Sequence, residues 1–215
     1  MEDFWTRLDE VRARWNVLEH PFYQRWSDGK LTRDELASYS GEYRHAVVAL
    51  ADAAAGAARA AGPAQRRALE AHAAEEASHV ALWDDFARAV GGDPATPAAP
   101  ETEACARAWA GDGDRGLLPS LVALYAIESG QPAISETKRA GLRDHYGIEG
   151  PEATAYFDLH ATLDHEHAAA ERALVEPLLD GAEVDALLAE AEAVLRANWR
   201  LLDGVERINS RASVD

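Results

Sequence analysis

The sequence contains little cysteine and little basic charge. Cys105 is its single cysteine, so one chain can build neither a disulfide framework nor a cysteine-rich zinc site. The net charge of −17 opposes binding to nucleic-acid phosphates and to anionic lipid headgroups. No apolar run approaches the roughly 20 residues that cross a bilayer, and the N-terminus is acidic where a secretion signal is basic. We therefore expect a cytoplasmic protein without nucleic-acid or membrane partners, in which histidine, aspartate and glutamate hold any metal.

Runs of β-branched residues are also absent, which argues against strands. Alanine, leucine, glutamate and arginine dominate, and apolar residues recur at intervals of three and four. We predict an all-α fold in a single domain over residues 1–208, with a polar tail at 209–215. A short aromatic helical turn is expected at 22–26. The seven principal helices are expected at 3–18, 32–61, 63–90, 101–110, 117–146, 152–179 and 183–208.

The strongest motif in the chain is His-x3-Asp-x2-His. His160, Asp164 and His167 are spaced i, i+4 and i+7, so a helix places all three on one narrow face. A solvated polar face is the alternative interpretation, because such patterns are common on helices of acidic proteins. The motif nevertheless offers three side chains of metal-ligand type that point in one direction.

A second stripe of this kind lies on the expected helix 63–90. His79 can pair either with Glu75 at i, i+4 or with Glu76 at i, i+3, and His72 lies on the same stripe. The Glu-x-x-His spacing is that of di-iron carboxylate bundles. The sequence leaves open which glutamate accompanies His79.

Glu128 is a carboxylate in an otherwise apolar helix. Its burial would be costly without a compensating charge, and a cation or an arginine would each supply one. Pro132 cannot donate a hydrogen bond to the carbonyl of Glu128, which predicts a kink at this point. Carboxylates mixed with imidazoles and without thiolates favour iron or manganese.

Aromatic residues and one lysine are further candidates. Tyr156 lies four residues before His160 and thus on the ligand face. The chain has only two lysines, Lys30 and Lys138, and Lys138 lies about three helical turns after Glu128. For each of these a core or surface role is the alternative to a catalytic one.

These motifs together resemble the haem-oxygenase-like superfamily, which includes thiaminase II and pyrroloquinoline-quinone synthase C. The similarity is greatest to its di-metal oxidases of the chlamydial death-domain-associating protein and para-aminobenzoate synthase type. Besides the ligand motifs, the segments that carry the resemblance are 20–23, 31–36 and 123–129.

The resemblance implies a bundle that binds two iron ions, or iron and manganese, and uses O2 as co-substrate. Its metal ligands would be Glu128, His160, Asp164, His167 and His79. Either Glu75 or Glu76 would accompany His79. In those proteins the first glutamate lies seven residues before the histidine, where this chain has His72.

The resemblance also suggests catalytic residues and a mode of assembly. Tyr23 would correspond to a tyrosine that such synthases consume, and Lys138 to their lysine. Ile127 stands where they tend to have tyrosine, which weakens transfer of the exact reaction. The substrate would be a small molecule or a side chain of the protein itself. Para-aminobenzoate synthesis is one reaction of this kind. The assembly would be a homodimer.

Two other function classes are alternatives to this oxidase. One is a metal-free thiaminase II-like hydrolase or quinone-synthase-C-like oxidase, and the hydrolase would need Cys105 as nucleophile. The other is a non-catalytic protein-interaction module, which would not depend on the histidines and carboxylates.

Overall fold

The computed structural model describes residues 2–111 and 115–212, and within these ranges every regular element is a helix. This confirms the predicted all-α fold. None of the described helices combines the length and the apolar character needed to cross a membrane. The α-helices are α1 (Glu2–Arg14), α2 (Pro21–Ser27), α3 (Arg33–Ala60), α4 (Pro63–Ala89), α5 (Pro100–Ala110), α6 (Leu117–Glu128), α7 (Gln131–Tyr146), α8 (Pro151–Val175) and α9 (Val184–Ala212).

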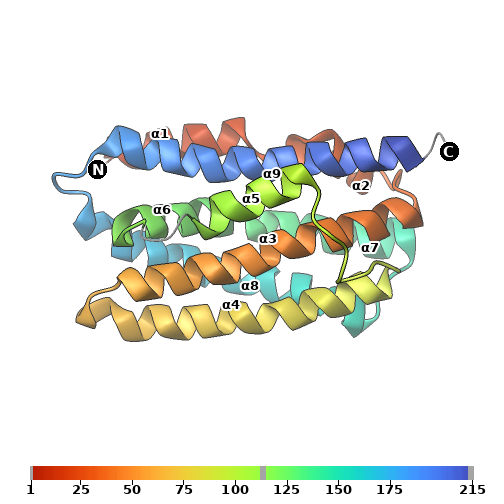
Figure 1. Cartoon of the computed structure of the whole chain (residues 1–215), viewed down its shortest axis with the longest axis horizontal. Coiled ribbons are helices and arrows are strands. Elements are labelled where there is room, and N and C mark those ends of the chain that lie inside the picture. Colours follow the sequence, from red (N-terminus) through yellow and green to blue (C-terminus); the bar gives the residue numbers. More distant parts are fainter. Residues whose placement is uncertain (1, 112–114, 213–215) are drawn as a thin grey trace.

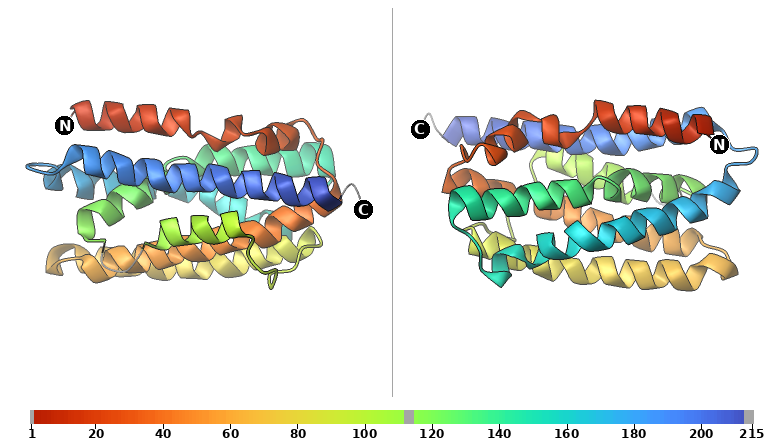
Figure 2. Two further views of the ribbon diagram at one scale, coloured as in Figure 1. Left: turned by 45° about the horizontal axis from the view of Figure 1, so that its top comes forward. Right: turned by 180° about the vertical axis from the view of Figure 1, so that it is seen from behind.

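The helices lie along one long axis and form an elongated bundle (Figure 1). The N- and C-terminal ends of the chain lie at opposite ends of this bundle. Seen from behind, α7 and α8 run side by side (Figure 2), and α8 also packs against α4 and α6. The packing therefore brings together α4, α6 and α8, the three helices that carry the predicted ligands.

Helix α6 is the apolar centre of the bundle. Every residue from Ser120 to Glu128 is buried, as expected for a helix that is hydrophobic on all sides. It packs against α3, α8 and α9. Glu128 is the last residue of this helix and is 1% exposed, so its carboxylate lies inside the protein.

The segment predicted as one helix at 117–146 is two helices. α6 ends at Glu128 and α7 begins at Gln131, because Pro132 has no N–H to donate to the carbonyl of Glu128. The side chain of Arg12 donates to the carbonyl of Ser129 at 3.2 Å and so satisfies one of the freed acceptors. The predicted kink is thus a complete break.

Two other helices end at different residues from those predicted. The helix expected at 3–18 ends at Arg14, and a 3-10 turn follows at Val17–Glu19, where Asn16 accepts a hydrogen bond from the N–H of Leu18 at 3.2 Å. At the other end, α9 continues to Ala212, so part of the predicted polar tail is helical. Asn209 is buried there, and residues 213–215 lie outside the described ranges.

Helices α2 and α7 approach each other closely at a glycine. The indole N–H of Trp26 donates to the carbonyl of Lys138 at 3.2 Å. A Cβ atom at Gly141 would lie 2.5 Å from Cδ1 of the Trp26 ring. The absence of a side chain at Gly141 therefore allows α2 to bring Tyr23 towards Lys138.

We predict that Gly141→Ala lowers the free energy of unfolding by about 1–3 kcal/mol, the usual cost of overpacking. Urea denaturation followed by circular dichroism measures this. Gly56→Ala is the matched control, because a Cβ atom there would contact only the flexible end of Arg59, at 3.6 Å. This change should leave the stability of the protein unchanged or slightly higher. Equal stability of the two variants would contradict the close approach.

Candidate metal centre

On α4, the helical period selects which glutamate faces the interior. His72, Glu76 and His79 are spaced i, i+4 and i+7 and share one face. The side chain of Glu76 is 3% exposed, whereas that of Glu75 is 42% exposed. Oε1 of Glu76 lies 3.2 Å from Nδ1 of His79. The structure thus places the Glu-x-x-His pair at Glu76 and His79, and Glu75 at the rim, where it hydrogen-bonds to Nε2 of His167.

On α8, the His-x3-Asp-x2-His motif turns inward as one face. His160 and Asp164 are buried and His167 is partly buried, whereas His165 and Glu166 are exposed. The solvated-face alternative for this motif is therefore wrong. All three side chains point from α8 towards α4 and α6, which carry the other candidate ligands.

Glu128 joins the two faces from the end of α6. Its Oε1 lies 3.3 Å from Nε2 of His72, and its Oε2 lies 3.3 Å from Nδ1 of His167. The described residues show no arginine paired with Glu128, which was the alternative account of its burial.

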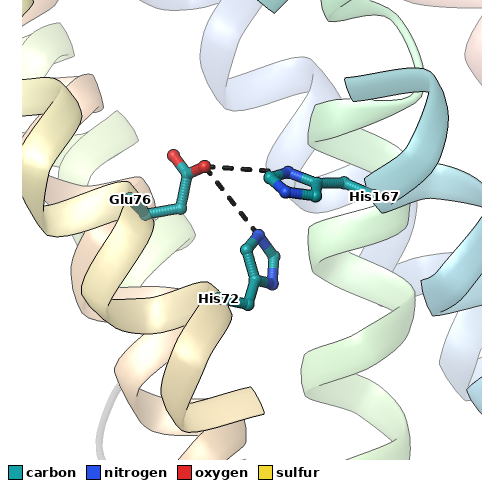
Figure 3. A group of neighbouring side chains, drawn as sticks. All are labelled: His72, Glu76 and His167. Atoms are coloured by element: carbon teal, nitrogen blue, oxygen red, sulfur yellow. Dashed lines mark ion pairs between the residues drawn. The ribbon is translucent and has the colours of Figure 1, made fainter. Parts of the chain in front are cut away.

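The three helices bring these donors to a common region. Figure 3 shows His72 and Glu76 on α4 and His167 on α8 pointing towards one another. In each of four overlapping groups, one ligand atom per residue lies within 4.8 Å of the others. The groups are His72, Glu76 and His167; Glu76, His79 and His160; Glu128, Asp164 and His167; and His72, Glu128 and Glu171.

Glu171 is a candidate ligand that the sequence analysis missed. It lies four residues after His167 and hence on the same face of α8, and its side chain is 2% exposed. The signal was present, because the i, i+4, i+7 series of the motif extends by one more step at i+11. His72 was recognised only as an alternative, and the structure directs it to the same region.

The donor atoms at this centre lack protein hydrogen-bond partners. Both carboxylate oxygens of Glu128 and of Glu171 and both ring nitrogens of His160 are buried without a hydrogen bond of acceptable geometry. Atoms of Glu76, His79, Asp164, His167 and His72 share this state. Buried polar atoms nearly always have a hydrogen-bond partner. A concentration of buried oxygen and nitrogen atoms without such partners in one region is therefore what a metal centre requires.

Burial and neighbouring charges shift the pKa values at the centre in opposite directions. Burial, with the nearby carboxylates of Glu128 and Glu76, raises the pKa of Asp164 to about 9. Burial, with the nearby imidazole of His79, lowers the pKa of His160 to about 3. Burial alone would lower the pKa of His167, but its 3.3 Å contact with Oε2 of Glu128 and the negative charge of that carboxylate raise it to about 9. Without a metal, protons therefore compensate the carboxylates, and cation binding would displace them.

An aromatic cage adjoins the metal donors and encloses Lys138, whose side chain is 1% exposed. Its Nζ lies 4.6 Å from the ring centre of Tyr43 and 5.6 Å from that of Tyr23, and it makes no ion pair with any described residue. Burial lowers the pKa of Lys138 well below its usual value. Tyr39, Trp83 and Phe157 complete the cage.

The cage is connected to the metal donors through Tyr156. The ring of Tyr156 lies over His160, with ring centres 4.0 Å apart, and contacts Trp83 of the cage. The hydroxyls of Tyr23 and Tyr39 share a hydrogen bond of 3.0 Å. The three predicted catalytic residues, Tyr23, Lys138 and Tyr156, thus lie in one buried cluster beside the centre.

Comparisons with known proteins show the family to which the chain is related. A family model described as iron-containing redox enzyme matches residues 38–199. A protein of Nitrosomonas europaea named 4-aminobenzoate synthase is 32% identical over 94% of this chain and 90% of its own length. A protein of the same name from Chlamydia trachomatis is also 32% identical, over 94% of this chain and 91% of its own length.

Solved structures share the fold at lower identity. A TenA homologue from Pseudomonas syringae has a TM-score of 0.81 at 17% identity, covering 96% of this chain and 92% of its own. A domain with a haem-oxygenase-like fold from Shewanella denitrificans has a TM-score of 0.78 at 21% identity, covering 94% of this chain and 91% of its own. These likenesses confirm the predicted haem-oxygenase-like fold.

Proposed function

This chain belongs to the family of iron-containing redox enzymes, and on that basis we propose that it is a non-haem di-iron oxidase that uses O2. That it is an iron-containing oxidoreductase follows from the family. The number of ions and the co-substrate are part of the proposal. The observation that supports both is the set of buried carboxylates and imidazoles that α4, α6 and α8 bring together without hydrogen-bond partners.

The donors would divide between two ions. Glu76, His79 and His160 form one group, and Glu128, Asp164 and His167 form the other. The mixture of carboxylate and imidazole suits iron, or iron with manganese. When bound, such a pair of ions supplies the electrons for reduction of O2.

The residues around the centre control water and protons. Tyr156 covers one face of His160 and contacts Trp83, a residue of the cage, on the other side. Burial lowers the pKa of Lys138, and a lowered pKa makes its amine better suited to accept and return a proton near neutral pH. The hydroxyl of Tyr23, held by Tyr39, lies in the same enclosure.

Metal analysis of protein produced with added iron tests the proposal. We expect close to two metal ions per chain in the unaltered protein and a loss of at least one in His160→Ala, because that imidazole belongs to the fully buried donor group. His165→Ala is the control, since His165 lies on the same helix and is exposed. Only trace iron or manganese in the unaltered protein, or equal metal content in His160→Ala, would refute the oxidase.

We propose a reaction of the 4-aminobenzoate synthase class, in which the protein acts on its own side chain at Tyr23. The names of the two relatives and the position of Tyr23 in the cage with Lys138 support this. A small external substrate is the alternative within the same proposal. The homodimer and the absence of nucleic-acid and membrane partners remain predictions.

Intact and peptide mass spectrometry checks the role of Tyr23. After exposure to iron, reductant and O2, we expect a loss of mass confined to the peptide that contains Tyr23, with Tyr146 unchanged as the internal control. Tyr23→Phe should show no loss. An unaltered Tyr23 would exclude self-modification and leave an external substrate.

The thiaminase-like alternative receives no support at Cys105. This residue is buried in α5, and burial raises the pKa of its thiol. A thiol that stays protonated is a poor nucleophile. Activity that survives chelation and disappears in Cys105→Ala would favour the hydrolase instead.

A further inference from the structure

Two donors lie at the centre in addition to the six that form the proposed pair of groups. They are His72, on the first half of α4, and Glu171, on the second half of α8. With Glu128 they form a fourth cluster whose ligand atoms lie within 4.8 Å of one another. This cluster lies at the end of the centre that contains His167, because the rings of His72 and His167 are 4.3 Å apart.

His72 is directed at carboxylates from both ligand groups. Its Nε2 lies 3.3 Å from Oε1 of Glu128 and 3.8 Å from Oε1 of Glu76. That nitrogen is buried and makes no hydrogen bond of acceptable geometry. An imidazole between two carboxylates is in a position to share a cation with them.

Glu171 has no protein group to compensate its charge. Both of its carboxylate oxygens are buried without a hydrogen-bond partner, and no described arginine or lysine forms an ion pair with it. His72 and Glu128 are the ligand-type residues that lie within 4.8 Å of it. Two buried carboxylates side by side repel each other unless a proton or a cation lies between them.

We infer that His72 and Glu171 are additional ligands of the cation bound by Glu128, Asp164 and His167. This inference rests on the proposed function and deepens it. The ion at this end would have five donor residues, whereas Glu76, His79 and His160 supply three to the other ion. A hard divalent cation such as Fe2+ or Mn2+ prefers such a mixture of oxygen and imidazole donors. The two positions therefore differ in affinity, and the end with His72 and Glu171 fills first.

Titration of the metal-free protein with Mn2+ under anaerobic conditions tests this inference. Calorimetry and the electron paramagnetic resonance of free Mn2+ report the number of ions bound and their affinities without any measurement of activity. We expect two ions of unequal affinity in the unaltered protein. In Glu171→Gln and in His72→Ala, the affinity of the tighter ion should fall at least about tenfold, as is typical when groups around a metal are changed.

Matched controls come from the exposed residues of the same motif. Glu166→Gln and His165→Ala carry the same substitutions on α8 away from the centre, and both should bind two ions as the unaltered protein does. Because glutamine has the shape of glutamate, Glu171→Gln should fold even if His72→Ala does not, and circular dichroism verifies this.

The possible outcomes separate the inference from the proposed function. Two ions bound with unchanged affinity in Glu171→Gln would overturn the inference and leave the di-metal oxidase standing. A loss confined to the weaker ion, or a third ion in the unaltered protein, would overturn it as well. An unaltered protein that binds no ion would refute the proposed function itself.

Discussion

Asp164→Asn is expected to make the metal-free protein more stable and at the same time to remove one bound metal ion. The carboxyl group of Asp164 has a pKa of about 9 in the folded protein, because it is buried beside Glu128 and Glu76. In the unfolded chain its pKa is near 3.9. At neutral pH, folding without metal must therefore protonate this group, which asparagine avoids.

The difference in pKa between the folded and the unfolded state determines how the contribution of Asp164 to stability changes with pH. Because the folded pKa is raised, the contribution of Asp164 to stability is complete below about pH 4 and is lost as the pH rises towards 9. At pH 7 the variant should gain on the order of 2–4 kcal/mol, since each pKa unit corresponds to about 1.4 kcal/mol. For a chain of this size that corresponds to a melting temperature higher by about 5–10 °C.

Thermal unfolding in the presence of a chelator at pH 5, 7 and 9 measures the effect. The advantage of Asp164→Asn should grow with pH over this series, whereas Glu166→Gln, exposed on the same helix, should behave as the unaltered protein at every pH. With iron restored, the unaltered protein should become the more stable of the two. A variant that is less stable without metal at pH 9 would contradict the raised pKa.

Lys138→Met is expected to abolish activity while the protein becomes more stable. Methionine keeps the length and the apolar stem of lysine, and it removes an amine that is buried without an ion pair in the described structure. Loss of a proton-transfer group typically costs at least about a hundredfold in rate. The variant should be more stable than the unaltered protein at pH 7, because burial disfavours the charged amine whereas the ammonium ion is fully hydrated in the unfolded chain.

Two effects oppose each other at Lys138, and the measurement decides between them. The surrounding rings would stabilise an ammonium ion by about 0.5–2 kcal/mol each, whereas burial disfavours the charge and lowers the pKa of Lys138. Urea denaturation at pH 7 and O2 consumption by the iron-loaded protein give the two readouts. Lys30→Met, which changes the only other lysine at an exposed site, should alter neither. A less stable Lys138→Met would show that the cage holds a charged amine.

The sequence predicted the positions of the ligand helices because their motifs follow the helical period. His160, Asp164 and His167 could be assigned to one face from spacing alone, and the structure places them there. The choice between Glu75 and Glu76 could not be made in the same way, because both lie within one turn of His79. It depends on the direction in which α4 packs against α8, which is a tertiary property.

Glu171 and the aromatic cage show the limit of reasoning from local patterns. Glu171 lies among alanine and charged residues, a composition typical of a solvent-exposed helix surface. Its burial follows from the packing of α8 against α6. The rings around Lys138 come from α2, α3, α4 and α8. No spacing within a single helix indicates that such distant segments meet.

The break between α6 and α7 has an electrostatic consequence for the centre. Because α6 ends at Glu128, the aligned peptide dipoles of that helix terminate there and leave a partial negative charge at its last turn. Helix α7 begins at Gln131, so the partial positive charge of its first turn lies a few residues away and offsets much of this potential. The attraction of the centre for positive ions therefore comes from its carboxylate side chains rather than from the backbone.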